Sequence, residues 1–201
     1  MCKSIYSLKE LHDLLETHPH QQELILFLDL DLTLIQEKCS LPKKDEDSEC
    51  EEDELIEPEV TRKLFDFLHK QNIWYTFVTA RFHDHVLVKK KKRDEILHEM
   101  TDNIEKLYPI FEELGVDCSE YKSNVSDILV IKNDHKKPVG IMYKGLLLGD
   151  KKGELIKFFR KQYGIDKTHP HVIFLDDIDK YIKSVKRHVP DAIVLKREIK
   201  K

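Results

Sequence analysis

Residues 24–28 form an uninterrupted apolar run, LILFL, and two aspartates follow it with only one leucine between them. An apolar run without polar alternation is typical of a strand covered on both faces, as in a parallel sheet. Two carboxylates this close repel each other. Asp29 and Asp31 at the end of a buried strand therefore indicate either a shared hard cation or a proton to be moved.

Two later apolar runs also end in polar residues. Residues 73–78, IWYTFV, lead into the tripeptide TAR, and residues 172–175, VIFL, lead into a pair of aspartates. A last apolar run follows at 192–195. The helical stretches between the runs are the crossovers that parallel strands require. The sequence therefore predicts an α/β fold with a mainly parallel central sheet.

Polar side chains at the carboxyl ends of these strands should meet in one crevice, because ligands of an open parallel sheet bind beyond that edge. Closely spaced carboxylates from two strand ends suit Mg²⁺, which prefers oxygen ligands and commonly bridges carboxylates to a substrate phosphate. The residues expected to converge are Asp29, Asp31, Thr79, Arg81, Asp176 and Asp177.

A phosphate group also needs donors and a cation. The hydroxyl of Thr79 and the backbone N–H groups after it supply donors. The stretch GDKKGELIKFF places Lys151 or Lys152 at the start of a helix that Gly164 ends. A lysine beside a helix N-terminus combines two favourable contributions for an anion. The P-loop pattern G-x-x-x-x-G-K-[ST] does not occur, so this is a different kind of phosphate site.

These motifs, in this order, resemble those of the haloacid dehalogenase-like (HAD-like) phosphatase superfamily. The resemblance spans residues 24 to about 194 and consists of DLDLT after the first strand, Thr79 after the second, Lys152, and the aspartate pair after the third. The KGE form around Lys152, with the preceding GIMYKGLLLGD, also resembles a poorly characterised bacterial subgroup. The resemblance implies a Rossmann-like three-layer sandwich, the HAD-like core, and phosphatase activity.

The resemblance also implies catalytic roles that agree with the chemistry of the residues. Asp29 would attack phosphorus and become an aspartyl-phosphate. Asp31 would protonate the leaving oxygen and then take a proton from the hydrolytic water, with its backbone carbonyl on the metal. Thr33 would order the loop that carries both aspartates.

The remaining roles concern the phosphoryl group and Mg²⁺. Thr79 would bind a phosphoryl oxygen, with Ala80 and Arg81 beside it, and Lys152 would neutralise phosphoryl charge and restrain the nucleophile. Positioning and electrostatics do most of the work in phosphoryl transfer, so this small set is sufficient. The expected metal ligands are Asp29, Asp31, Asp176 and Asp177.

Alternatives remain open for several of these residues. Lys151 could be the functional lysine, although Lys152 directly precedes the glycine as in the subgroup. Asp177 could instead cap the following helix, and Arg81 could only pair with an acidic neighbour. For the whole chain, the alternatives are a catalytically silent HAD-like binding or regulatory module, or a phosphotransferase of the same superfamily. Asp31 argues against a dehalogenase, because that enzyme needs no proton donor two residues after its nucleophile.

Length and composition predict one domain over residues 1–201. The acidic stretch within residues 36–57 predicts a solvated, mobile loop, because so much charge leaves little apolar area to order it. Residues after Arg81 predict a helix through about Leu114, followed by strands at 128–131 and 139–148. This is little more than a crossover, so we expect a minimal cap and an open site for a phosphorylated small molecule or macromolecule.

The charge distribution bears on partners and location. A net charge of −4, from 34 basic and 38 acidic side chains, argues against nucleic acid, and the run KKKKR at 89–93 has no interleaved aromatic residues. No apolar stretch approaches a membrane span and no secretion signal is visible, which predicts a cytoplasmic protein with no membrane partner. The sequence gives no indication of oligomeric state.

Overall fold

The computed structural model describes residues 2–39, 50–80, 104, 106–116, 128–143 and 146–198. Within these residues the chain forms an α/β fold around an eight-stranded sheet, in the order β1-β10-β9-β2-β5-β8-β7-β6. The strands are β1 (Cys2–Ile5), β2 (Leu24–Leu28), β5 (Trp74–Thr79), β6 (Ile128–Lys132), β7 (Pro138–Tyr143), β8 (Leu146–Leu148), β9 (His171–Asp176) and β10 (Ile193–Arg197).

The predicted parallel sheet is confirmed. Strand β2 lies between β5 and β9 and is parallel to both, and β10 continues the parallel pairing beyond β9. Leu28, the last residue of β2, is opposite Phe77 on one side and Leu175 on the other. This register brings the carboxyl ends of the three predicted strands to the same edge of the sheet.

Two parts of the sheet differ from the sequence prediction. Strand β1 is parallel to β10 at one edge of the sheet and was not predicted, because four residues are too few to show a pattern. The predicted strand at 139–148 is two strands, β7 and β8, which pair antiparallel. Strand β6 pairs antiparallel with β7 at the opposite edge, so only this end of the sheet is not parallel.

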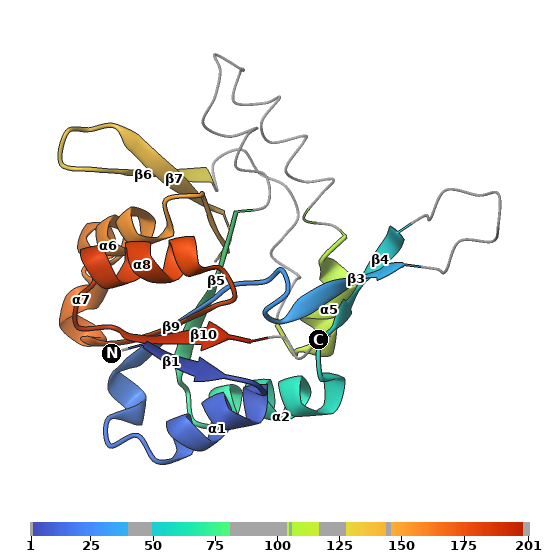
Figure 1. Cartoon of the computed structure of the whole chain (residues 1–201). Helices are drawn as coiled ribbons and strands as arrows, with labels where there is room; N and C mark the ends of the chain where they lie inside the picture. Colours follow the sequence, from blue (N-terminus) through green and yellow to red (C-terminus); the bar gives the residue numbers. More distant parts are fainter. Residues whose placement is uncertain are drawn as a thin grey trace.

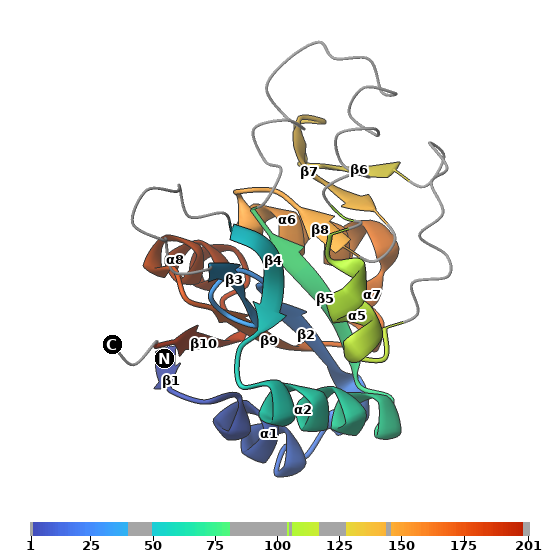
Figure 2. The ribbon, with the colours of Figure 1, turned by 90° about the vertical axis from the view of Figure 1, so that its right-hand side faces the viewer.

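Helices cover both faces of the sheet (Figures 1 and 2). They are α1 (Leu8–Glu16), α2 (Pro58–Lys70), α5 (Tyr108–Glu113), α6 (Lys152–Tyr163), α7 (Ile165–Thr168) and α8 (Asp179–His188), with a short 3-10 turn η1 (Gln21–Glu23). Alternate residues of β2 enter two separate cores. Leu26 packs with residues of α1, α2 and α5, whereas Phe27 packs with residues of α6, α7 and α8. Burial on both faces explains why β2 is apolar throughout.

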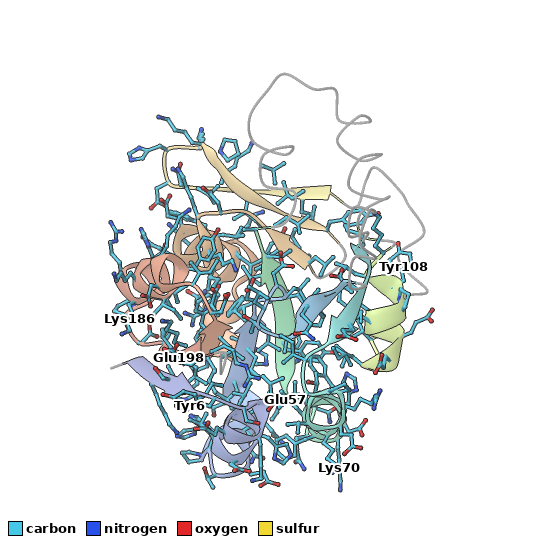
Figure 3. The ribbon with its side chains drawn as sticks, turned by 45° about the vertical axis from the view of Figure 1, so that its right-hand side comes forward. Tyr6, Glu57, Lys70, Tyr108, Lys186 and Glu198 are labelled. Carbon is cyan, nitrogen blue, oxygen red and sulfur yellow. The ribbon has the colours of Figure 1, made fainter. Side chains whose placement is uncertain are left out.

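The first two helices begin at defined caps. The hydroxyl of the N-cap Ser7 accepts a hydrogen bond from Lys9 N, and the Glu10 carboxylate accepts one from Tyr6 N, just before the cap. The Glu57 carboxylate accepts from Leu8 N and from Arg197, each at 2.9 Å. Glu57 directly precedes α2 (Figure 3), so this side chain joins the starts of α1 and α2 to the end of β10.

The acidic segment after the first motif is not simply a loop, and that prediction is wrong for the residues on either side of its centre. Strands β3 (Ile35–Cys39) and β4 (Cys50–Leu55) pair antiparallel as a separate ribbon. Ile35 and Leu55 face each other at its base and are buried in the core. Backbone pairing and this apolar anchor order the flanks despite their charge. The centre, 40–49, lies outside the described residues, so its predicted mobility stays a prediction.

The segment after β5 is described only in part. Most of the predicted helix before Leu114, and the basic run at 89–93, lie outside the described residues, so the minimal cap stays a prediction. Ile104, Leu107, Ile110 and Phe111 are described and are buried in the core beside α2. None of the helices in the described part of the chain has both the length and the apolar character that a membrane crossing requires.

Candidate active site

Asp29 lies at the carboxyl end of β2, at the point where the chain leaves the sheet. Its N–H still donates to Leu175 O of β9 at 3.0 Å, so the residue is held in line with the strand. The chain then turns tightly around the carbonyl of Leu30, which accepts from the N–H groups of Leu34 and Ile35. Leu32 adopts a left-handed conformation with φ of 55° within this turn. Such a conformation is rare for a leucine and is typical of functional loops.

The centre of the site is a buried lysine between two aspartates. The Lys152 ammonium lies 2.5 Å from Asp29 Oδ1 and 2.7 Å from Asp176 Oδ2. All three side chains are at most 4% exposed. A buried ion pair is stable only with good geometry and further hydrogen bonds, since each charge loses its hydration. This arrangement supplies both.

Two threonines hold the first two aspartates. The buried Thr33 hydroxyl donates to Asp29 Oδ2 at 3.1 Å, so both oxygens of Asp29 are engaged. The Thr79 hydroxyl donates to Asp31 Oδ2 at 3.3 Å and thereby joins the ends of β2 and β5. Asp31 is partly exposed, whereas Asp29 is buried. The two carboxylates thus have different surroundings despite being two residues apart.

A close helix contact positions Lys152. It is the first residue of α6, and the next residue, Gly153, packs against α8 so closely that a Cβ there would lie 2.3 Å from Ser184 O. The glycine therefore explains how the lysine comes to be buried at the site. Lys151 is exposed, so the structure places Lys152, and not Lys151, between the aspartates.

The two aspartates at the end of β9 differ in their contacts. Asp176 Oδ1 accepts from Ile178 N at 2.8 Å, while its other oxygen contacts Lys152. Asp177 is not the N-cap of α8, because that position is Ile178. Asp177 Oδ1 is buried and has no hydrogen-bond partner within the described part of the chain.

An unsatisfied buried carboxylate oxygen is costly and calls for a missing cation or water. Asp29, Asp176 and Asp177 each offer one oxygen within 4.8 Å of the others. This set of carboxylate oxygens fits a hard divalent cation such as Mg²⁺. Asp31 is expected to bind through its backbone carbonyl, which is not one of these side-chain oxygens, and its carboxylate contacts Thr79.

Burial shifts the protonation equilibria of the site. Burial raises the pKa of Asp29 to about 7, against the opposing effect of Lys152, and burial also raises the pKa of Asp176. Burial and the neighbouring charge of Asp29 raise the pKa of Asp177. For Lys152, burial lowers the pKa but the attraction of Asp29 and Asp176 outweighs it, so the pKa is raised and the ammonium is kept. Clustered shifts of this kind are frequent at functional sites.

Sequence reasoning missed one aromatic contact at this site. The Lys152 ammonium lies 4.3 Å from the ring centroid of Tyr181, in the first turn of α8. Tyr181 is buried with Ile182 and Val185 on the inner face of α8. An aromatic residue on the core-facing side of the helix that follows the aspartate pair was the one feature of the sequence that could have indicated this contact. Of the remaining predicted residues, Ala80 is partly buried and follows Thr79, whereas Arg81 lies outside the described residues.

No protein-family model, curated protein or solved structure matches this chain. The fold and the site define an α/β protein with a mainly parallel sheet, in which buried carboxylates at the strand ends contact one lysine.

Proposed function

We propose that this protein is a Mg²⁺-dependent phosphohydrolase that cleaves phosphate monoesters through an aspartyl-phosphate at Asp29. The observation that carries the proposal is the buried contact of Lys152 with both Asp29 and Asp176. With both carboxylates ionised, the single charge of Lys152 balances only one of Asp29 and Asp176. The remaining negative charge attracts a divalent metal ion. The same lysine is within reach of a phosphoryl group that approaches Asp29.

The order of the strands supports the assignment to a Rossmann-like, HAD-like core. When the edge strand β1 is set aside, the parallel strands β8, β5, β2, β9 and β10 stand third, second, first, fourth and fifth in the chain. Rossmann-like sheets have this order and bind their ligands where it reverses. Asp29 follows β2 and Asp176 ends β9, the two strands on either side of that reversal.

Asp29, Asp176 and Asp177 would hold the Mg²⁺. When bound, the ion supplies positive charge that offsets the charge of the phosphoryl oxygens and of the clustered carboxylates. The Oδ1 of Asp177 supports this ligand set, because a cation there satisfies an oxygen that has no hydrogen bond among the described residues.

The side chains then have distinct tasks. A carboxylate oxygen of Asp29 attacks phosphorus, the bond from phosphorus to the leaving oxygen breaks, and Asp31 gives that oxygen a proton. Asp31 next takes a proton from water, whose oxygen attacks phosphorus, and the bond to Asp29 breaks to release inorganic phosphate. Thr33 and Lys152 fix the orientation of the Asp29 carboxylate throughout. The Thr79 hydroxyl, which donates to Asp31 in the absence of substrate, would turn to a phosphoryl oxygen.

The test is hydrolysis of p-nitrophenyl phosphate by the full chain with Mg²⁺, with a chelator, and in the Asp29→Asn variant. We expect turnover only with Mg²⁺ and wild-type Asp29, and an acid-quenched sample should carry one phosphate on the peptide containing Asp29. The exposed Asp166 of α7 provides the matched control, because Asp166→Asn changes the same functional group far from the site. Activity that survives the chelator or Asp29→Asn would refute the mechanism.

A further inference from the structure

A second group of cation ligands lies at the opposite end of β9. His20 and Glu23 are at the two ends of the 3-10 turn η1, and His171 is the first residue of β9. Leu24 pairs with His171 in the β2–β9 register, which brings Glu23 beside His171. A six-residue strand separates this group from Asp176, a distance of about 17 Å at the usual rise per residue.

The spacing of the three side chains fits one shared metal ion. Glu23 Oε2 lies 3.5 Å from His171 Nε2 and 3.9 Å from His20 Nδ1, and the possible ligand atoms of all three residues lie within 4.8 Å of one another. Two ligands bound tetrahedrally at the usual zinc distances lie about 3.4 Å apart. These separations are longer than good hydrogen bonds and are ion pairs only where an imidazole carries a second proton, whereas one metal ion would join all three neutral or anionic groups at once.

The two imidazoles contact each other and a third histidine. The rings of His20 and His171 stack with centroids 4.7 Å apart and planes at 15°, so one of these exposed rings turns out of the stack when both bind one ion. The ring of His18 lies 5.8 Å from that of His171, but His18 Nδ1 accepts a hydrogen bond from the N–H of His20. The neutral His18 ring therefore carries its proton on Nε2 and has no free nitrogen for a metal. His18 supports the group without belonging to the ligand set.

We propose that His20, Glu23 and His171 form a zinc site, separate from the site at Asp29, that fastens the turn before β2 to the start of β9. Two imidazoles and one carboxylate are a ligand set that zinc accepts, with water in the fourth position. All three side chains are between 40% and 54% exposed, so the ion reaches them from solvent without any rearrangement of the core.

Calorimetric titration of the full chain with Zn²⁺, in excess Mg²⁺, tests the proposal. Relative to wild type, His20→Ala, Glu23→Gln and His171→Ala should each weaken the tightest zinc site by about tenfold or more, because each removes one of three ligands. The matched control is His18→Ala, which removes an adjacent imidazole that is not a ligand and should weaken the affinity less than any of the three ligand substitutions.

A second control covers the other histidine and carboxylate group found among the described residues, formed by His12, Asp13 and Glu16 on α1. His12→Ala should leave the tightest zinc site unchanged. If His12→Ala abolishes that site, or if His171→Ala titrates like wild type, the proposal is wrong.

The single tryptophan of the chain provides an independent readout. Trp74 is opposite Ile25 at the start of β5, two strands from β9, which is about 10 Å by strand spacing. Cu²⁺ binds nitrogen and oxygen ligands more tightly than zinc and quenches nearby tryptophan fluorescence. Micromolar Cu²⁺ should quench Trp74 in wild type and in His18→Ala, but not in His20→Ala or His171→Ala. Equal quenching in all four proteins would overturn the assignment.

Discussion

The ammonium of Lys152 lies 2.5 Å from the carboxylate of Asp29, although 123 positions separate the two residues in the chain. The contact depends on where two elements end and begin, since Asp29 follows β2 and Lys152 is the first residue of α6. It links the proposed nucleophile to the proposed phosphate-binding cation. Its loss should therefore affect both activity and stability.

Replacement of Lys152 tests that coupling. Lys152→Met keeps the length of the side chain but leaves Asp29 and Asp176 as buried carboxylates without a counter-charge. We expect hydrolysis of p-nitrophenyl phosphate to fall by about 10²-fold or more. The free energy of unfolding at pH 8 without metal should fall by a few kcal/mol. Lys151→Met is the matched control, because Lys151 is exposed, and it should change neither quantity appreciably.

The raised pKa of Asp29 predicts how stability depends on pH. In the folded, metal-free protein Asp29 keeps its proton up to about pH 7, against a value of 3.8 for an ordinary aspartate. The folded state then binds more protons than the unfolded state between these values. The free energy of unfolding should therefore fall as pH rises from about 4 to 7 and then level off.

Urea unfolding in a chelator, repeated across this pH range, measures that dependence. Asp29→Asn should flatten the slope and make the metal-free protein more stable than wild type at pH 8. Asp166→Asn, at an exposed position, should keep the wild-type slope. A stability that rises with pH over this range in wild type would contradict the assignment of a buried, protonated Asp29.

Asp176 and Asp177 should respond differently to substitution. Asp177→Ala removes an oxygen without a hydrogen bond in the described structure, so it should weaken Mg²⁺ binding while leaving metal-free stability unchanged or slightly higher. Asp176→Ala also removes the contacts with Lys152 and Ile178 N, so it should weaken both Mg²⁺ binding and stability. Calorimetry with Mg²⁺ and urea unfolding in a chelator separate the two effects. Unchanged Mg²⁺ affinity in Asp177→Ala would remove Asp177 from the ligand set.

Gly153 offers a test of how Lys152 is positioned. A Cβ at this position would lie 2.3 Å from the backbone oxygen of Ser184, so Gly153→Ala must push the start of α6 away from α8. We expect a loss of about 1–3 kcal/mol in stability together with a large loss of activity. Gly164→Ala is the control. Its left-handed φ of 67° costs stability, about 1–2 kcal/mol, but no atom lies near the added Cβ and activity should be kept.

The parallel sheet could be predicted from the sequence because three apolar runs, at Leu24, Ile73 and Val172, have no polar alternation. The expectation that their ends meet follows from the same pattern, and the structure brings Asp29 and Asp176 to one edge of the sheet. A buried strand paired on both sides must be apolar along its length. Its end is therefore visible in the sequence as the point where an apolar run stops.

Features set by contacts between distant side chains left no such trace. In the sequence, Tyr181 is indistinguishable from the other core-facing residues of its helix. Its contact with the Lys152 ammonium is visible only in the three-dimensional structure. The ribbon of β3 and β4 depends on Ile35 meeting Leu55, two residues separated by a strongly acidic stretch. Charge content predicted a loop there, because composition does not reveal which backbone segments pair.

The pairing of β1 with β10 has a consequence for how this chain folds. Cys2 is opposite Val194, so β1 pairs with a strand that follows it only after all the other described strands of the sheet. A contact between such distant segments carries a high cost in loop entropy and forms late. The central strands can assemble around β2 while β1 remains an unpaired edge. Completion of the sheet therefore depends on β10, and a chain in which β10 has not yet folded exposes β1 with no strand to pair with.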